Sequence, residues 1–220
     1  MDYLRKFIGF IKKWGLRKAV YRSLIYLSSK KEDTLYGDYK RKHFVGIEGN
    51  IVEVGVGYGS NFTYCGSIDS LTLIEPDVID KDDLDKKLRQ LQIKRLSIIE
   101  KPFEDVALQA SSIDTFVASL VLCGVKDPAH FLNLVYEALK PGGKFFFLEH
   151  IRAKSVLRRT LQDLINPFWC GLSGGCRCNR KTDTQLLSDS RFTVLSHDTF
   201  RTVAGFPWVK DHVIGVLEKK

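Results

Sequence analysis

Residues 51–61 read Ile-Val-Glu-Val-Gly-Val-Gly-Tyr-Gly-Ser-Asn, and this stretch decides the fold class. Residues 51–54 are apolar except for Glu53, which predicts a buried β-strand. The alternating glycines that follow predict a turn directly after the strand. Because glycine lacks a Cβ atom, a ligand can approach the backbone of such a turn closely. The turn is a weak signal alone, so its meaning depends on the residues that lie at defined distances further along the chain.

Apolar runs and helical patterns alternate after Gly49, which predicts one α/β domain on a parallel sheet with helices on both faces. The expected strands are Asn50–Val54, Leu71–Glu75, Leu96–Glu100, Thr115–Leu120, Lys144–Glu149, Phe192–His197 and His212–Leu217. The expected helices are Asp82–Leu91, one that begins at Pro128 after the N-cap Asp127 and stops at Pro141-Gly142-Gly143, and Thr184–Asp189. We expect residues 165–181 to be irregular.

Positive charge is confined to the N-terminal segment. The formal net charge is +8, and residues 1–31 hold nine Lys or Arg residues and one acidic residue, Asp2. The remainder is neutral, which argues against a nucleic-acid groove across the fold, and we expect no nucleic-acid partner. We divide the chain into a basic amphipathic helical arm at residues 1–31 and a domain at residues 32–220.

The arm has an amphipathic pattern and no apolar run long enough for a membrane span. At helical spacing one face carries Leu4, Phe7, Ile8, Ile11 and Trp14, and lysines and arginines take the opposite side. Such a helix suits the surface of an anionic bilayer, so residues 1–27 predict a membrane contact. The equal alternative is a helix that packs this face on the domain and covers the ligand site.

Five cysteines, an odd number in a chain of 220 residues, indicate reduced thiols in a cytosol-facing protein. Cys170, Cys176 and Cys178 are close in sequence, which suggests a zinc site. Their spacing lacks a C-x-x-C pair and a second pair of ligands, so we predict no metal site. Cys123 is interpreted as a small buried apolar residue and not as a nucleophile.

Five motifs together resemble the class I S-adenosylmethionine-dependent methyltransferases. They are Glu53-Val-Gly-Val-Gly-Tyr-Gly59, the acid Glu75, Ser119-Leu-Val-Leu-Cys-Gly-Val-Lys126, Leu139-Lys-Pro-Gly-Gly143 and Phe147-Leu-Glu-His150. Within that superfamily the chain is most similar to the methyltransferase-like 7 group, small membrane-associated thiol S-methyltransferases, from about Ser28 to its end. The resemblance implies a Rossmann-like fold, with a seven-stranded, mostly parallel sheet whose last strand is antiparallel. It also implies methyl transfer to a thiol sulfur at a membrane surface.

The resemblance implies S-adenosylmethionine as cofactor. One carboxylate can accept hydrogen bonds from both hydroxyls of a ribose, and Glu75 lies 22 residues after Glu53, at the end of an expected strand. Phe103 either packs on the adenine or fills the core, and Asn61 is more simply read as a helix cap. The predicted cofactor-binding residues are Glu53, Gly55, Gly57, Gly59, Asn61, Glu75, Pro76, Phe103, Glu104, Ser119 and Leu120.

The site for the methyl acceptor is predicted to lie at the end of the fifth expected strand. His150 lies there and is the candidate catalytic base for a thiol, with support of the pocket rim as the alternative. A thiol with a pKa near 8.5 already ionises by a few per cent at neutral pH, so a strong base is optional. Four aromatic residues either roof the acceptor pocket or fill the core: Phe168, Trp169, Phe206 and Trp208.

The leading prediction is a methyltransferase that acts on a small apolar acceptor, with a thiol as first choice. Alternatives keep the cofactor and change the acceptor to a quinone, a lipid amine or a hydroxyl, or make the chain a non-catalytic cofactor-binding module at a membrane. A nicotinamide dehydrogenase is disfavoured, because Ser60 stands where a dinucleotide fingerprint requires glycine or alanine. We expect a cytoplasmic protein, peripheral on the cytosolic face of the endoplasmic reticulum or on lipid droplets.

Overall fold

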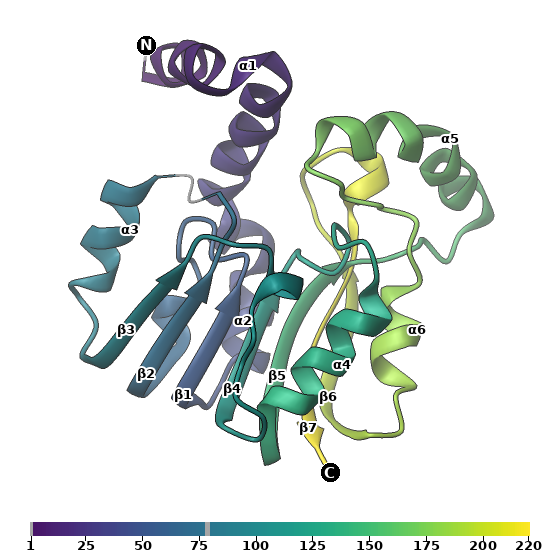
Figure 1. Cartoon of the computed structure of the whole chain (residues 1–220). Helices are drawn as coiled ribbons and strands as arrows, with labels where there is room; N and C mark the ends of the chain where they lie inside the picture. The colour runs from purple at the N-terminus through teal and green to yellow at the C-terminus, as the bar shows by residue number, and fades with distance from the viewer. Residues whose placement is uncertain (1, 78–79) are drawn as a thin grey trace.

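The computed structural model describes residues 2–77 and 80–220, and within the first helix it leaves undescribed the side chains of residues 2–7, 10, 12–14, 17 and 18. A single sheet with the strand order β3-β2-β1-β4-β5-β7-β6 organises the chain (Figure 1). Pairs among the first five strands are parallel, and β7 is antiparallel to both of its neighbours, β5 and β6. The strands are β1 Ile47–Val54, β2 Cys65–Ile74, β3 Ile93–Ile99, β4 Ile113–Ser119, β5 Leu139–His150, β6 Phe192–Arg201 and β7 Asp211–Lys219.

Six α-helices flank the sheet in the part of the chain that the structure describes. They are α1 Asp2–Ser29, α2 Asp38–His43, α3 Lys81–Leu88, α4 Pro128–Ala138, α5 Val156–Leu172 and α6 Thr182–Leu187. Short helical turns lie at η1 Asp33–Gly37, η2 Phe62–Tyr64, η3 Phe103–Asp105 and η4 Pro207–Val209. The predicted start of α4 is confirmed, because Asp127 accepts hydrogen bonds from two N-terminal amides and Pro128 is the first helical residue. The predicted fold class is therefore confirmed.

The core has two layers, one on each face of the sheet. Phe131 and Val135 of α4 pack with Phe116 and Phe145 on one face. On the other face, Leu84 and Leu88 of α3 join residues of α2, η1 and the central strands. Alternating strand residues point to opposite faces, so each central strand contributes to both layers.

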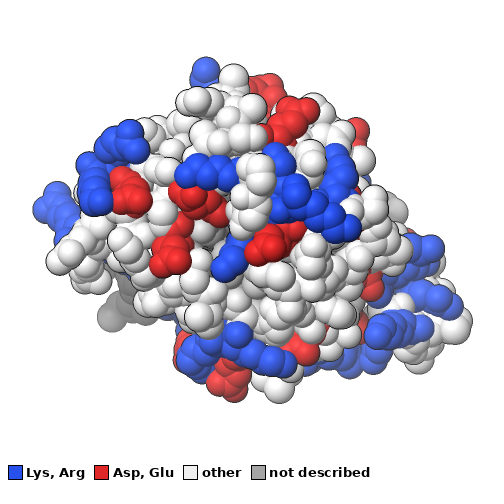
Figure 2. Space-filling view, turned by 90° about the horizontal axis from the view of Figure 1, so that it is seen from below, with Lys and Arg blue, Asp and Glu red and all other residues white. Residues whose placement is uncertain are grey.

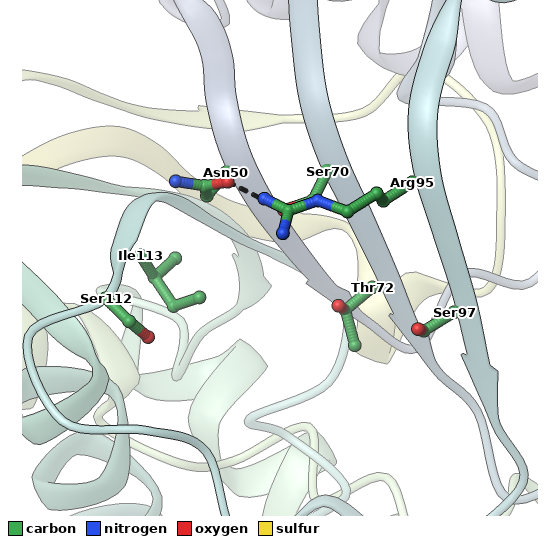
Figure 3. A pocket seen from close by; sticks show the side chains of 7 residues that line it. All are labelled: Asn50, Ser70, Thr72, Arg95, Ser97, Ser112 and Ile113. Carbon is green, nitrogen blue, oxygen red and sulfur yellow. Dashed lines mark hydrogen bonds between the residues drawn. The ribbon is translucent and has the colours of Figure 1, made fainter.

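On the sheet face against which α4 packs, the helices do not reach the β2–β3 edge. The sequence had predicted helices over both faces. Polar side chains of three strands line a hollow of about 370 Å³ at this edge (Figure 3). Ser70 donates a hydrogen bond of 2.8 Å to Asn50 across its floor. Water can solvate these groups, which explains why this part of the sheet face carries Ser, Thr and Arg instead of apolar residues. The hollow lies away from the strand ends that carry the glycine turn.

Helix α1 is broken at Gly15, which has φ 79° and ψ 166°. The part before Gly15 lies apart from the sheet, and the part after it descends to the body of the molecule (Figure 1). Ala19, Arg22 and Ser23 in this second part are buried. The second half of α1 therefore packs on the domain, whereas the apolar face of the packing alternative precedes Gly15 and falls largely on side chains outside the described residues. No helix in residues 2–77 and 80–220 combines the length and apolar character that crossing a bilayer requires.

The end of the molecule opposite the N-terminal half of α1 carries both signs of charge. Blue and red side chains are intermixed over most of this face, and blue ones prevail at its lower right edge (Figure 2). This agrees with a neutral domain whose excess positive charge comes from the N-terminal segment.

Two local predictions are wrong. Residues 165–181 are not wholly irregular, because α5 runs to Leu172 through Pro167. Gln162, which is buried in α5, bonds through its amide to the backbone of Ala153 and Cys178, so tertiary contacts anchor this helix although an interior proline costs roughly 3 kcal/mol. The expected cap at Asn61 is also absent, because a single 3-10 turn and then β2 follow it, with no side-chain cap bond.

Candidate active site

The glycine turn leaves β1 with a backbone that only glycine adopts easily. Gly55, Gly57 and Gly59 have φ of 71°, 53° and 64°, in the left-handed region. A Cβ atom on Gly55 would lie 2.5 Å from Cγ2 of Val121, so the turn passes directly against the segment after β4. The structure thus builds the bare-backbone cradle that the sequence predicted at this strand end.

A buried polar network supports the turn from below. Asn61 donates hydrogen bonds to Glu53 at 2.8 Å and to Ser119 at 3.2 Å, and its amide oxygen accepts one of 2.7 Å from Lys40. Lys40, only 1% exposed, also pairs with Glu32. Burial raises the pKa of Glu53 to about 7, although the Asn61 bond opposes this shift. The side chains of Glu53, Asn61 and Ser119 are therefore engaged with one another, and direct cofactor contact by them stays a prediction.

Glu75 comes directly after the last residue of β2 and reaches back to the glycine turn. Its two carboxylate oxygens accept long hydrogen bonds from the amides of Gly57, at 3.4 Å, and Asp77, at 3.3 Å. Burial raises the pKa of Glu75 above its ordinary value. Because both bonds are long, the carboxylate retains acceptor capacity for two hydroxyls, which is what a ribose requires.

The predicted adenine side is assembled only in part. Phe103 is 3% exposed, and its ring packs 5.3 Å from that of Phe116 and 4.8 Å from that of Phe131, so the core-filling alternative describes its side chain. Glu104 is exposed in the turn η3, and Pro76 is exposed after β2. An adenine contact in this loop would therefore come from backbone groups or from Glu104.

Leu120, directly after β4, has a strained backbone. Its φ is 60°, a left-handed value that a bulky residue rarely adopts. The strain is held by Glu149, which is fully buried and accepts hydrogen bonds from the amides of Val121 and Leu122 at 2.8 Å and of Cys123 at 3.2 Å. Burial raises the pKa of Glu149 to about 7. Strain of this kind collects at functional sites, which supports the prediction that Ser119–Leu120 faces the cofactor.

His150 lies at the end of β5 beside two cysteines. Sγ of Cys176 is 3.5 Å from Nδ1 of His150, and Cys123 completes a group of three ligand atoms within 4.8 Å of one another. The hydrogen bond from Cys123 lowers the pKa of Cys176 well below its ordinary value, and His150 and Trp169 act in the same direction. Burial lowers the pKa of His150, but Cys176 and Glu149 outweigh it, so the net shift is upward. The sequence brought together Cys170, Cys176 and Cys178, whereas the structure joins Cys176 to Cys123 and His150.

A cluster of aromatic residues adjoins this group through Trp169, which interacts with Cys176. The rings of Phe206 and Trp208 stack at 5.0 Å, and Trp169 meets Trp208 edge-on at 5.7 Å. His212 on β7 lies 4.7 Å from the ring of His150 and accepts a hydrogen bond of 3.2 Å from Tyr36, because its other ring nitrogen donates to the carbonyl of Lys210. Phe206 is itself 44% exposed, so the cluster is open to solvent there, and Phe168 is 74% exposed.

Comparison with known proteins connects this geometry to a family. A family model for a methyltransferase domain matches residues 52–147. The human (Homo sapiens) thiol S-methyltransferase TMT1A is 30% identical, over 100% of this chain and 91% of its own length. The rat (Rattus norvegicus) thiol S-methyltransferase TMT1B is 32% identical, over 73% of this chain and 67% of its own. The chain belongs to the TMT1 thiol S-methyltransferase family.

This TMT1 family member is an S-adenosylmethionine-dependent methyltransferase, and S-adenosylmethionine is its cofactor. Among solved structures, a SAM-dependent methyltransferase of Methanosarcina mazei matches its fold with a TM-score of 0.61 at 17% identity, over 84% of this chain and 98% of the other. The residues present fit the cofactor, because the turn is open at Gly57, where a Cβ atom would have only the carbonyl oxygen of Gly55 within 4 Å, and because Glu75 keeps acceptor capacity beside it.

The second half of α1 lies against the candidate site of this TMT1 family member; the sequence offered a helix that covers the ligand site as an alternative but did not indicate which residues make the contacts. Arg22 pairs with Asp77 after β2, and the ring of Tyr26 lies 6.0 Å from that of Tyr58 in the glycine turn. The ring of Tyr21 sits against Gly174, where a Cβ atom would be 2.6 Å away. Only packing in three dimensions reveals these contacts, since an amphipathic pattern does not say which surface a helix covers.

Proposed function

We propose that this enzyme transfers a methyl group to the sulfur of a small apolar thiol. The observation that carries the proposal is His150 at the carboxyl edge of the sheet, beside Cys176, in a chain whose relatives TMT1A and TMT1B are thiol S-methyltransferases. In this proposal the neighbouring cluster of Trp169, Phe206 and Trp208 forms an aromatic enclosure for the acceptor, and apolar walls with a few polar groups suit a small apolar molecule.

In this proposal the cofactor rests between the glycine turn and Glu75. The bare backbone of the Gly55–Gly59 turn approaches its methionine part, although the amides of Gly55 and Gly59 already donate to the carbonyls of Ile74 and Val56. Glu75 accepts hydrogen bonds from the ribose. When bound, the cofactor supplies an electrophilic methyl group on a sulfonium with a good leaving group. The second half of α1 and the aromatic enclosure exclude water and align the acceptor, which is the main contribution that such a displacement requires.

In this proposal His150 assists the ionisation of the acceptor thiol. An acceptor thiol must lose its proton before or during attack, and an imidazole in the enclosure can hold that proton or favour the thiolate. Acceptors that lack an easily ionised group, such as alcohols, would gain less from this arrangement, since their protons are far less acidic. The geometry therefore favours a thiol over a hydroxyl.

The test uses S-adenosylmethionine labelled in its methyl group. The full chain is given straight-chain alkyl thiols of increasing length, the matching alcohols and the matching amines. Labelled thioether from the thiols, with kcat/KM rising with chain length, is expected. Labelled product from amines or alcohols alone would show that the acceptor is one of these groups and not a thiol, and the protein would still be a methyltransferase. No product from any thiol would overturn the thiol acceptor.

The proposal also places the enzyme at an anionic membrane, peripheral on the cytosolic face of the endoplasmic reticulum or on lipid droplets. Beyond the basic arm, α5 supports this with an exposed apolar face at helical spacing, and Leu157, Leu164 and Phe168 on it are 80%, 67% and 74% exposed. Lys154 is exposed just before the helix. Both α5 and the N-terminal part of α1 lie beyond the carboxyl edge of the sheet (Figure 1), on the side of the proposed acceptor site. Apolar residues flanked by cations suit an anionic lipid surface.

Flotation with vesicles tests the membrane contact. The full chain should float with vesicles of phosphatidylcholine and phosphatidylserine, and less so as salt is raised. Leu164→Ser with Phe168→Ser should weaken binding by about tenfold or more, because each apolar side chain contributes about 1.5–3 kcal/mol when buried. Leu96→Ser on β3, where the leucine is 45% exposed but remote from α5, is the matched control. Equal flotation of all three proteins would exclude α5 as a contact.

A further inference from the structure

Cys123, His150 and Cys176 form a cluster whose arrangement resembles a metal site. They come from the segment after β4, the end of β5 and the segment after α5, and their ligand atoms all lie within 4.8 Å of one another. Cys123 and Cys176 are 2% and 8% exposed. The other two cysteines of this region point elsewhere, because Cys170 donates to the carbonyl of Gly175 and Cys178 to the side chain of Asn166.

We propose that Cys123, His150 and Cys176 bind a zinc ion whose fourth position is open to the acceptor sulfur. Zinc–sulfur bonds of about 2.3 Å and zinc–nitrogen bonds of about 2.0–2.1 Å, at a tetrahedral angle, place the two ligand atoms about 3.6 Å apart. The observed separation between Sγ of Cys176 and Nδ1 of His150 is 3.5 Å. Two thiolates and an imidazole leave one position free, the pattern of catalytic zinc sites.

The backbone holds the ligand-bearing segments together before any metal binds. The amide of Arg177 donates a hydrogen bond of 2.7 Å to the carbonyl of Cys123. A Cβ atom on Gly175 would lie 3.1 Å from the carbonyl oxygen of Gly124, so two glycines beside the ligands permit this close approach. The three amides bonded by Glu149 fix the Cys123 segment from the other side. Such preorganisation lowers the cost of assembling a coordination site.

The cluster lies next to the proposed cofactor site. The segment after β4 joins the two sites, because Cγ2 of Val121 lies 2.5 Å from the position of a Cβ atom on Gly55 and Cys123 follows Val121 two residues later. A sulfur held at the open position would therefore be near the place where the methyl group is presented. This part of the inference rests on the proposed thiol acceptor, whereas the presence of the zinc ion does not.

The chemistry balances without a further reagent. Cys123 and Cys176 each release a proton to solvent when zinc binds, and the acceptor thiol releases one when its sulfur takes the fourth position. A lone pair of that sulfur then forms the new bond to the methyl carbon, and the bonding pair between that carbon and the sulfonium stays with S-adenosylhomocysteine. The product thioether is neutral and a weaker ligand than a thiolate, so it leaves. His150 acts here by holding the metal and not by taking the proton.

The first measurement is metal content. The full chain, produced without a histidine tag and given zinc chloride, should retain about one zinc ion per chain after gel filtration. Cys176→Ser and His150→Gln should lower this to less than about one-tenth, because each removes one of three protein ligands. Cys170→Ser is the matched control, since a serine hydroxyl can also donate to the carbonyl of Gly175, and should retain the zinc. Unchanged zinc content in Cys176→Ser, or no zinc in the unsubstituted chain, would overturn the site.

Cobalt(II) replacement answers the same question where a buried substitution prevents folding. The unsubstituted chain, stripped with a chelator and reloaded with cobalt, should show thiolate-to-cobalt charge transfer and the visible bands of a tetrahedral site. An alkyl thiol should shift the visible bands, and the matching alcohol should not. If no thiol shifts the cobalt bands, the acceptor sulfur does not take the fourth coordination position. Methylation of thiols by metal-free protein would overturn the role of zinc at the acceptor sulfur and leave the proposed function intact. Bound zinc without methylation of any thiol would overturn the proposed function and leave the metal site intact.

Discussion

The side-chain amide of Asn61 donates a hydrogen bond of 2.8 Å to the carboxylate of Glu53, and its oxygen accepts one of 2.7 Å from Lys40. One neutral residue thus connects a buried acid to a buried base beneath the glycine turn. Removing the amide leaves two buried polar groups without one of their partners. The free-energy cost of such unsatisfied groups is larger than the net stabilisation that the hydrogen bonds had provided.

Asn61→Ala should therefore lower the free energy of unfolding by about 2–4 kcal/mol, because Glu53 and Lys40 lose a partner in a buried setting. Urea unfolding followed by circular dichroism measures the change. Thr63→Ala, whose exposed hydroxyl makes a long bond of 3.4 Å, is the control and should stay within about 0.5 kcal/mol. Equal stability of the two variants would show that the network does not support the turn.

Gly55→Ala separates backbone strain from a steric clash. Gly142 has a similar φ, 76° against 71°, but a Cβ atom there meets nothing within 4 Å. Gly142→Ala should cost only the left-handed strain of about 1–2 kcal/mol, and Gly55→Ala should cost more, because its methyl group meets Val121. Unfolding measurements in the Val121→Ala background should recover the difference. A cost of Gly55→Ala equal to that of Gly142→Ala would refute the close approach.

Glu75→Gln should weaken binding of S-adenosylhomocysteine by at least about tenfold, or 1.4 kcal/mol, because a charge-assisted pair of bonds to the ribose is lost. Isothermal titration calorimetry measures it. Glu100→Gln is the matched control, since Glu100 comes directly after β3 and is paired with Lys81 at 2.6 Å on the surface. An affinity that both substitutions leave unchanged would remove Glu75 from the cofactor site.

The affinity of the unsubstituted chain for S-adenosylhomocysteine should fall as the pH is lowered. Burial raises the pKa of Glu75, so its carboxylate takes a proton at a higher pH than an ordinary glutamate does, and the protonated form has less capacity to accept from the ribose. Titrations over a series of mildly acidic pH values should show this fall, and Glu75→Gln should flatten it. A fall of the same size in Glu75→Gln would assign the dependence to another group.

Glu53 makes stability depend on pH in the opposite sense to a surface carboxylate. Its pKa is about 7 in the folded state and 4.5 in its unperturbed form, so the folded state binds the proton more tightly. Stability is therefore greatest at acid pH and is lost as pH rises from about 4.5 to about 7, by up to the order of 3 kcal/mol. Glu53→Gln, which can still accept from Asn61, should reduce this slope, whereas Glu137→Gln on the exposed side of α4 should leave it unchanged. Urea unfolding at several pH values decides between them.

The succession of strands along the chain and the position of the glycine turn were open to prediction because both depend on local patterns. An apolar run before Gly55, the cap at Asp127 and the acid at position 75 act within a few residues of themselves. The same reasoning failed at Pro167, where a helix anchored by the tertiary bonds of Gln162 continues through a local breaker. It also failed at Asn61, whose side chain caps no helix and instead bonds to Glu53 in the preceding strand.

The amino-acid sequence by itself determined that a parallel sheet ends in a bare glycine turn with an acid on the next strand, because backbone sterics and period-two burial are properties of short segments. Only the tertiary structure decided which distant side chains meet. Cys123, His150 and Cys176 are separated by 27 and 26 residues, and they converge because strands β4 and β5 end at one edge and α5 returns the chain to it. Spacing along a chain carries no information about such a meeting, since it is set by how the elements pack.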